Sequence, residues 1–218
     1  MLWRSARAPR DLSRRAAAGV CASMIVLATT VSVSTSPVGA TPAGSLPQTT
    51  IEPNLTTGLT AQMHVLWRAI TSNSPALADR VFFPRAAYLR MKTGLIPDPA
   101  ADYANRLIGF FNLDVAAYHR ALSTNPPVIF ARVLSSRSDA TWIAPGACEN
   151  KVGYWHLPGV RLVFKRRHRI ESAAVASLIS WRGVWYVVHL GPNPRPVNVG
   201  TVDGLRIGAG IPGPAGGC

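Results

Sequence analysis

The fold is decided by one stretch near the C-terminus, Ala173-Ala174-Val175-Ala176-Ser177-Leu178-Ile179-Ser180-Trp181-Arg182-Gly183-Val184-Trp185-Tyr186-Val187-Val188-His189-Leu190. Its β-branched and aromatic side chains favour two strands, and Arg182-Gly183 is the strongest turn signal in the chain. A two-residue turn there pairs Trp181 with Val184, Leu178 with Val187 and Ala176 with His189. Both faces of this hairpin are largely apolar, so both are expected to be covered.

Working towards the N-terminus, the chain keeps a β composition back to about residue 128. We expect strands over Val128–Leu134, Val152–Leu157 and Val160–Lys165, with a further short one at Thr141–Ile143. Together with the hairpin they predict a mostly antiparallel sheet.

Residues 57–127 are helical in pattern. Leu59, Met63, Leu66, Trp67 and Ile70 fall on one stripe of an amphipathic helix. The sequence therefore predicts a first helix whose apolar side faces the sheet.

Further helices are expected to begin at Ser74-Pro75 and Asp98-Pro99, because each pair offers a capping side chain followed by proline at the first helical position. A short helix over Arg85–Lys92 lies between them. Asn112-Leu113-Asp114 interrupts the apolar pattern of the longest helix, and Asp114 is expected to cap its continuation. Helices first and strands afterwards predict the α+β class, with helices packed on a curved sheet.

This order of elements over residues 57–190, and the closing hairpin 179–190, resemble the cone-shaped fold of the nuclear transport factor family, which includes ketosteroid isomerase-like and polyketide cyclase-like proteins. The resemblance implies a curved sheet that can enclose a pocket. It implies no single activity, because that family hosts enzymes, binding proteins and accessory domains. No motif matches position by position, so no catalytic residue is carried over. The two short helices between Ser74 and Gly94 depart from the family pattern, as does the tail.

The N-terminus has the plan of a secretory signal. Five arginines lie in the first 15 residues, an apolar stretch follows, and Val38-Gly39-Ala40 supplies small side chains for cleavage between Ala40 and Thr41. An uncleaved membrane anchor is the alternative, although the apolar stretch is shorter than a span needs and is diluted by Ser and Thr. We therefore expect a signal peptide at 1–40 and a secreted or cell-envelope protein.

The composition of the remaining chain predicts three parts. Residues 41–56 are rich in Pro and Thr and predict a flexible spacer, 57–190 form a single α+β domain, and 191–218 form a tail rich in Gly and Pro.

The mature chain is basic, since removing the five arginines and one aspartate of the leader leaves 18 basic and 9 acidic residues. A basic exported protein meets anionic envelope components, although moderate positive charge also serves solubility.

Two cysteines, Cys148 and Cys218, remain after the leader is removed. An even pair in an oxidising compartment favours a disulfide, which would fix the tail to the loop that contains Cys148. The competing interpretation is a free Cys218 that pairs between molecules.

Lys165-Arg166-Arg167-His168-Arg169 is the densest run of charge in the mature chain. Its lysine and its three arginines could bind phosphates of a polyanion, since arginine binds them through paired hydrogen bonds. The alternative is a sheet edge that charge protects from aggregation. Aromatic and basic residues interleave too loosely for a nucleic-acid module.

His189 is the first candidate for a site, because an imidazole in an apolar strand needs a partner. Trp185 and Tyr103 are candidate ligand contacts, and Asp102 is, with His189, a weak catalytic candidate in a cone-shaped pocket. Tyr88 and His156 are further companions. The alternative is a hydrogen-bonded core histidine.

The chain has no spacing typical of a metal site, of a serine nucleophile or of a phosphate loop, so neither a metal nor a cofactor is predicted. The leading hypothesis is an accessory protein that binds a ligand or partner and is not an enzyme. A small pocket enzyme (isomerase, cyclase or hydrolase) and a polyanion binder remain as alternatives.

Overall fold

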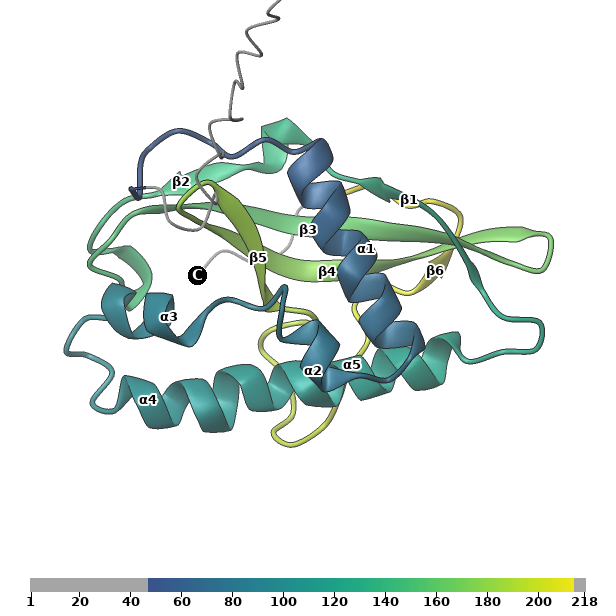
Figure 1. The fold of residues 1–218 in the computed structure, drawn as a ribbon, viewed down its shortest axis with the longest axis horizontal. Helices are drawn as coiled ribbons and strands as arrows, with labels where there is room; N and C mark the ends of the chain where they lie inside the picture. The colour runs from purple at the N-terminus through teal and green to yellow at the C-terminus, as the bar shows by residue number, and fades with distance from the viewer. Residues whose placement is uncertain (1–46, 214–218) are drawn as a thin grey trace, which may run out of the picture. The chain divides into compact units, whose positions relative to one another are not determined.

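A computed structural model describes residues 47–213 of the chain, and these form helices followed by a curved, antiparallel sheet (Figure 1). The protein therefore belongs to the α+β class. Its helices are α1 (Thr57–Thr71), α2 (Pro75–Ala78), α3 (Arg85–Met91), α4 (Pro99–Asp102), the π-helical turn η2 (Tyr103–Leu107) and α5 (Ile108–Leu122), with 3₁₀ turns η3 (Arg137–Asp139) and η4 (Ala147–Glu149). Within residues 47–213 no helix is long and apolar enough to cross a membrane.

Helix α1 follows the predicted stripe. Leu59, Met63, Leu66 and Ile70 are fully buried and join the core. At the start of α2 the Ser74 hydroxyl accepts a hydrogen bond from the Leu77 amide at 3.3 Å, which is the predicted cap.

The longest helix is continuous where a break was expected. It begins as predicted, with the Asp98 carboxylate accepting from the Ala101 amide at 2.9 Å. The prediction that Asp114 caps a second segment is wrong, since Asp114 lies inside α5 and is 1% exposed. The irregularity lies earlier, at the π-turn Tyr103–Leu107.

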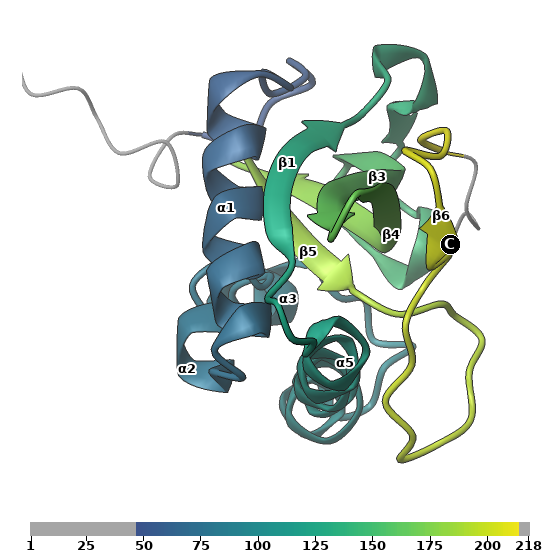
Figure 2. The same ribbon diagram turned by 90° about the vertical axis from the view of Figure 1, so that its right-hand side faces the viewer.

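The sheet has the strand order β1-β3-β4-β5, with β2 pairing with β3 and β6 pairing with β4, and every pairing is antiparallel. Viewed along the sheet, α1 lies on one side and α5 below (Figure 2). The strands are β1 (Ile129–Leu134), β2 (Thr141–Ile143), β3 (Tyr154–Arg166), β4 (Arg169–Trp181), β5 (Val184–His189) and β6 (Arg206–Ile207).

The prediction of two strands on either side of Pro158-Gly159 is wrong, because β3 runs through both residues. Strand β2 pairs with β3 up to His156 and β1 pairs from Arg161 onwards, so Pro158 falls in the gap between these partners. A missing N–H costs no ladder bond on that side. The Gly159 carbonyl accepts from the Gly213 amide at 3.2 Å, so the tail fills part of the gap.

Three segments without long elements lie against the sheet. In the stretch predicted as a spacer, the Thr50 carbonyl accepts from the Trp155 indole at 2.8 Å and the Pro53 carbonyl from the Trp185 indole at 3.2 Å. In the Gly/Pro-rich tail, β6 pairs with β4. The segment Val81–Phe83 pairs with β5, where the Phe83 amide donates to the Val187 carbonyl at 2.9 Å.

Candidate functional site: a cavity beside His189

The closing hairpin has the predicted register from Trp181↔Val184 to Leu178↔Val187, and then it shifts. Beyond that point Ser177 pairs with His189, so Val188 is the extra residue of a β-bulge. A shift of one residue moves a side chain to the other face of a sheet. His189 therefore leaves the face of Trp185 and joins the face of Ser177, and its predicted pairing with Ala176 is wrong.

That face borders a cavity of about 510 Å³. Its lining includes His156, Ser177, Ile179 and His189 from the sheet, and Lys92 and Arg106 from the helical side. The size lies within the range of about 300–1,000 Å³ typical of small-molecule sites. The bulge thus aims an imidazole into a cavity large enough for a ligand.

The imidazole of His189 has no hydrogen bond to any other residue among 47–213. Burial lowers the pKa of its imidazole to about 4, and the positive charges of Arg106 and Arg195, then His156 and Lys92, act in the same direction. The ring is consequently neutral at pH 7. It offers the cavity one donor and one acceptor that the described protein groups leave unused.

His156, the other cavity histidine, has a protein partner. Its Nε2 lies 2.7 Å from the Ser177 hydroxyl, and burial lowers its pKa. This is the hydrogen-bonded core histidine that was the alternative interpretation for His189.

A polar cluster from α3 and the long helix forms the opposite wall. The Tyr88 hydroxyl donates to the Asp102 carboxylate, and Arg106 binds the same carboxylate through Nε at 2.6 Å and Nη2 at 2.7 Å. Burial would raise the pKa of Asp102, but Arg106, Tyr88 and Lys92 together hold it below its usual value. Asp102 is therefore committed to its ion pair, which makes it a poor base.

Lys92 lies at the rim of this wall. Its ammonium is 3.5 Å from the Cys148 carbonyl and 5.1 Å from the centre of the Tyr88 ring. Burial lowers the pKa of Lys92, while the charge of Glu149 partly offsets that effect. Lys92 and Arg106 thus bring two cations to the cavity.

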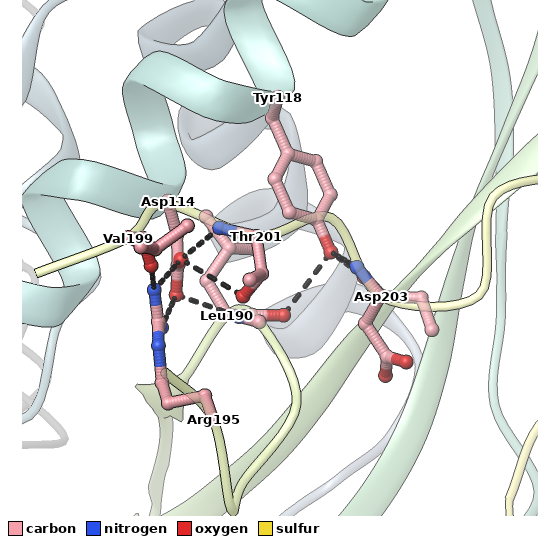
Figure 3. A network of polar contacts seen from close by, with 9 residues as sticks. Asp114, Tyr118, Leu190, Arg195, Val199, Thr201 and Asp203 are labelled. Carbon is pink, nitrogen blue, oxygen red and sulfur yellow. Dashed lines mark hydrogen bonds and ion pairs between the residues drawn. The ribbon is translucent and has the colours of Figure 1, made fainter. Parts of the chain in front are cut away.

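Asp114 fixes the loop that follows β5 (Figure 3). Its carboxylate is bound by both terminal nitrogens of Arg195 at 2.5 Å, and it accepts from the amides of Gly191 and Thr201, each at 2.9 Å. The side chains of Asp114 and Arg195 are 1% and 3% exposed. A buried carboxylate with this many donors holds residues 191–201 against α5.

Tyr118, one helical turn further on, positions the end of β5 and Asp203. Its hydroxyl lies 3.1 Å from the Leu190 carbonyl and accepts from the Asp203 amide at 2.9 Å. Two segments that border the cavity, at His189 and Asp203, are thereby tied to one side chain of α5.

The Asp203 carboxylate lines the cavity and has no hydrogen bond or ion pair within residues 47–213. Burial raises its pKa, and the charges of Arg161 and Arg206 oppose that effect. Its carboxylate therefore combines a raised pKa with a place in the same cavity as the imidazole of His189.

Other predicted residues lie elsewhere. Trp185 is buried on the opposite face of β5, and Tyr103 is buried with its hydroxyl donating to the Phe83 carbonyl at 2.7 Å. Neither lines the cavity, so both serve the core. Cys148 borders the cavity, while Cys218, Ala40 and Thr41 lie outside the described residues; the disulfide and the cleavage site stay predictions.

The basic run lies at the other end of the sheet, where Arg167 and His168 form the turn between β3 and β4. Arg166 is largely buried and binds Glu171 through Nε at 2.8 Å, and Arg169 binds the same carboxylate at 3.1 Å. Lys165, Arg167, His168 and Arg169 are exposed.

Sequence reasoning missed Lys92, Arg106 and Asp203 as cavity residues. Arg106 lies in a helical turn, where solvent-facing charge is common, Lys92 directly follows α3, and Asp203 lies in a segment dense in Gly and Pro. No local pattern distinguishes these residues from surface charges.

Comparison of the chain with family models, with curated proteins and with solved structures found no match.

Proposed function

We propose that this protein is a small-ligand-binding module whose site is the cavity beside His189. The observation that carries the proposal is a mostly buried, neutral imidazole that faces about 510 Å³ of space without a hydrogen-bond partner among residues 47–213. A buried polar group without a partner costs roughly 1–3 kcal/mol, and a bound ligand would recover that cost.

The lining favours a ligand that carries both apolar and polar groups. Phe83, Ile96, Leu107 and Ile143 supply apolar walls, while polar and charged side chains supply a comparable share of the lining and His189 can orient one polar group of the ligand. Apolar walls with convergent polar groups are typical of ligand sites.

The test is a fragment screen by NMR that includes acids, amides and alcohols, read at the ring resonances of His189. We expect at least one fragment to shift these resonances and the His189→Leu variant to lose its binding. His168→Leu, a change at an exposed histidine in the β3–β4 turn, is the matched control and should retain binding. A screen in which bound fragments leave the His189 ring unchanged contradicts the proposal.

The cellular setting of the proposal is the envelope or the exterior. It is supported by the basic, apolar and small-residue order of residues 1–40 and by a positive net charge that suits anionic surroundings. The resemblance to the cone fold is likewise a proposal, supported by helices that precede a curved antiparallel sheet beside a cavity.

An enzyme is the second candidate, favoured by one observation. Asp203 is a carboxylate without a partner among the described residues, it lines the same cavity as His189, and burial raises its pKa towards the range of a general base. Asp203→Asn separates the two functions. A binding protein retains fragment affinity and has no turnover to lose, whereas an enzyme retains affinity and loses turnover of its substrate.

A further inference from the structure

The β3–β4 hairpin ends in a tip that the cavity does not explain. Each strand is 13 residues long, and the hairpin projects at one end of the molecule (Figure 1). Its turn, Arg167-His168, begins eleven residues beyond His156 along the chain, or up to about 36 Å from the cavity. A partner at the tip would therefore leave the cavity open.

The charged side chains exposed at the tip are all basic. Lys165, Arg167 and Arg169 are exposed cations, with His168 beside them. The acidic neighbour, Glu171, has a side chain that is 8% exposed and is already bound by Arg166 and Arg169. Little negative charge is left at the surface to offset the cations.

Two aliphatic side chains are also exposed at the tip, and both pair with Lys165 across the strands. Ile129 pairs with Lys165 across β1 and β3, and Lys165 pairs with Ile170 across β3 and β4, so the three side chains form one row on one face. Ile129 is 66% exposed and Ile170 is 36% exposed. The row therefore alternates apolar, basic and apolar.

We propose that this tip docks on the surface of a membrane rich in anionic phospholipid. The cations match the headgroup phosphates, which attract basic residues near the surface. The two isoleucines can enter the boundary between headgroups and acyl chains, while Lys165 keeps its ammonium at the phosphates. A soluble polyanion such as a nucleic acid or a sulfated glycan would use the cations but would gain nothing from exposed isoleucine.

The experiment is sedimentation of the purified full chain with two kinds of vesicle, one of phosphatidylglycerol and phosphatidylcholine and one of phosphatidylcholine alone. We expect binding to the anionic vesicles, reduced at least roughly 25-fold by Lys165→Glu with Arg167→Glu, since each basic residue contributes about fivefold. The matched control is Arg68→Glu with Arg80→Glu, which changes net charge equally at two exposed arginines away from the hairpin and should bind as the unchanged chain does.

A second variant distinguishes lipid from soluble polyanion. Ile129→Thr with Ile170→Thr keeps every charge and keeps β-branched side chains, and should weaken vesicle binding several-fold without changing retention on heparin. Equal binding to both kinds of vesicle would overturn the proposal, as would equal losses in the hairpin and control variants. Vesicle binding that the isoleucine changes leave unaltered would also overturn the proposal, because the tip would then bind anionic surfaces through charge alone.

Discussion

The two ends of strand β3 place positive charge in opposite settings. At His156 the strand borders a cavity in which Lys92 and Arg106 lie beside two histidines, and burial shifts the pKa of each histidine. At Arg166 the strand enters a hairpin whose other cations are exposed. Charge at the first end is costly and has to be fixed by partners, whereas charge at the second end is hydrated and free to meet a partner.

This difference predicts where substitutions destabilise the protein. Near the cavity Asp102 with Arg106, and Asp114 with Arg195, belong to networks that join separate segments, so removing one of these charges should loosen several segments. At the tip Lys165, Arg167 and Arg169 are exposed, so their removal should change binding more than it changes the stability of the fold.

The largest expected effect is that of Asp114→Ala, which removes the anion that holds Arg195, Gly191 and Thr201. We expect a loss of about 3–5 kcal/mol in the free energy of unfolding, because Arg195 is left as a buried charge without its partner. Urea denaturation followed by fluorescence measures it. Asp98→Ala is the matched control: it removes a capping carboxylate at the start of α4 and should cost about 1 kcal/mol. Similar losses in the two variants would show that Asp114 is no more than a local contact.

The second effect is a pH dependence of stability that originates at His189. Its pKa is about 4 in the folded protein and 6.5 as the ordinary value, so between these values the unfolded chain binds more protons. Stability should therefore fall as pH decreases from 6.5 to 4, by up to about 3 kcal/mol. His189→Gln removes the titrating group and should flatten the curve of unfolding free energy against pH. His168→Gln, at the exposed tip, should leave the curve unchanged. A curve that His189→Gln does not alter would assign the dependence to other groups.

The fold could be predicted from sequence wherever a local signal decided it. Arg182-Gly183 fixed the register of the closing hairpin because a two-residue turn leaves one way to pair the flanking strands. The stripe from Leu59 to Ile70 likewise defined α1.

The prediction failed where a distant segment decides the outcome. Val187-Val188-His189 fits a regular strand equally well, so nothing in it indicates a bulge at Val188. Asp114 has the residue type of a cap, and its partner Arg195 lies 81 residues away in a segment without pattern. The site combines both failures, because the bulge aims His189 and the Asp114 network holds the loop beside it.

The smallest expected effect is a difference in unfolding free energy between substitutions of two adjacent arginines at the tip. Arg166 is 18% exposed, binds the buried Glu171 and donates to the Ala121 carbonyl at 3.0 Å. Its change to Ala leaves that carboxylate with Arg169, whose side chain is 62% exposed, and should cost about 1–3 kcal/mol in unfolding free energy. Arg167→Ala should stay within about 0.5 kcal/mol of the unchanged chain, because its contact to the Asn125 carbonyl is long, at 3.5 Å, and exposed.

Urea midpoints for the two arginine variants, measured together with anionic-vesicle binding, complete this comparison. Arg166→Ala should lower the midpoint more than Arg167→Ala, while Arg167→Ala should weaken vesicle binding more than Arg166→Ala. The reverse order in both measurements would mean that Arg166 reaches the partner and Arg167 supports the hairpin. In that case the contrast between fixed charge at the cavity and free charge at the tip would not extend to these two residues.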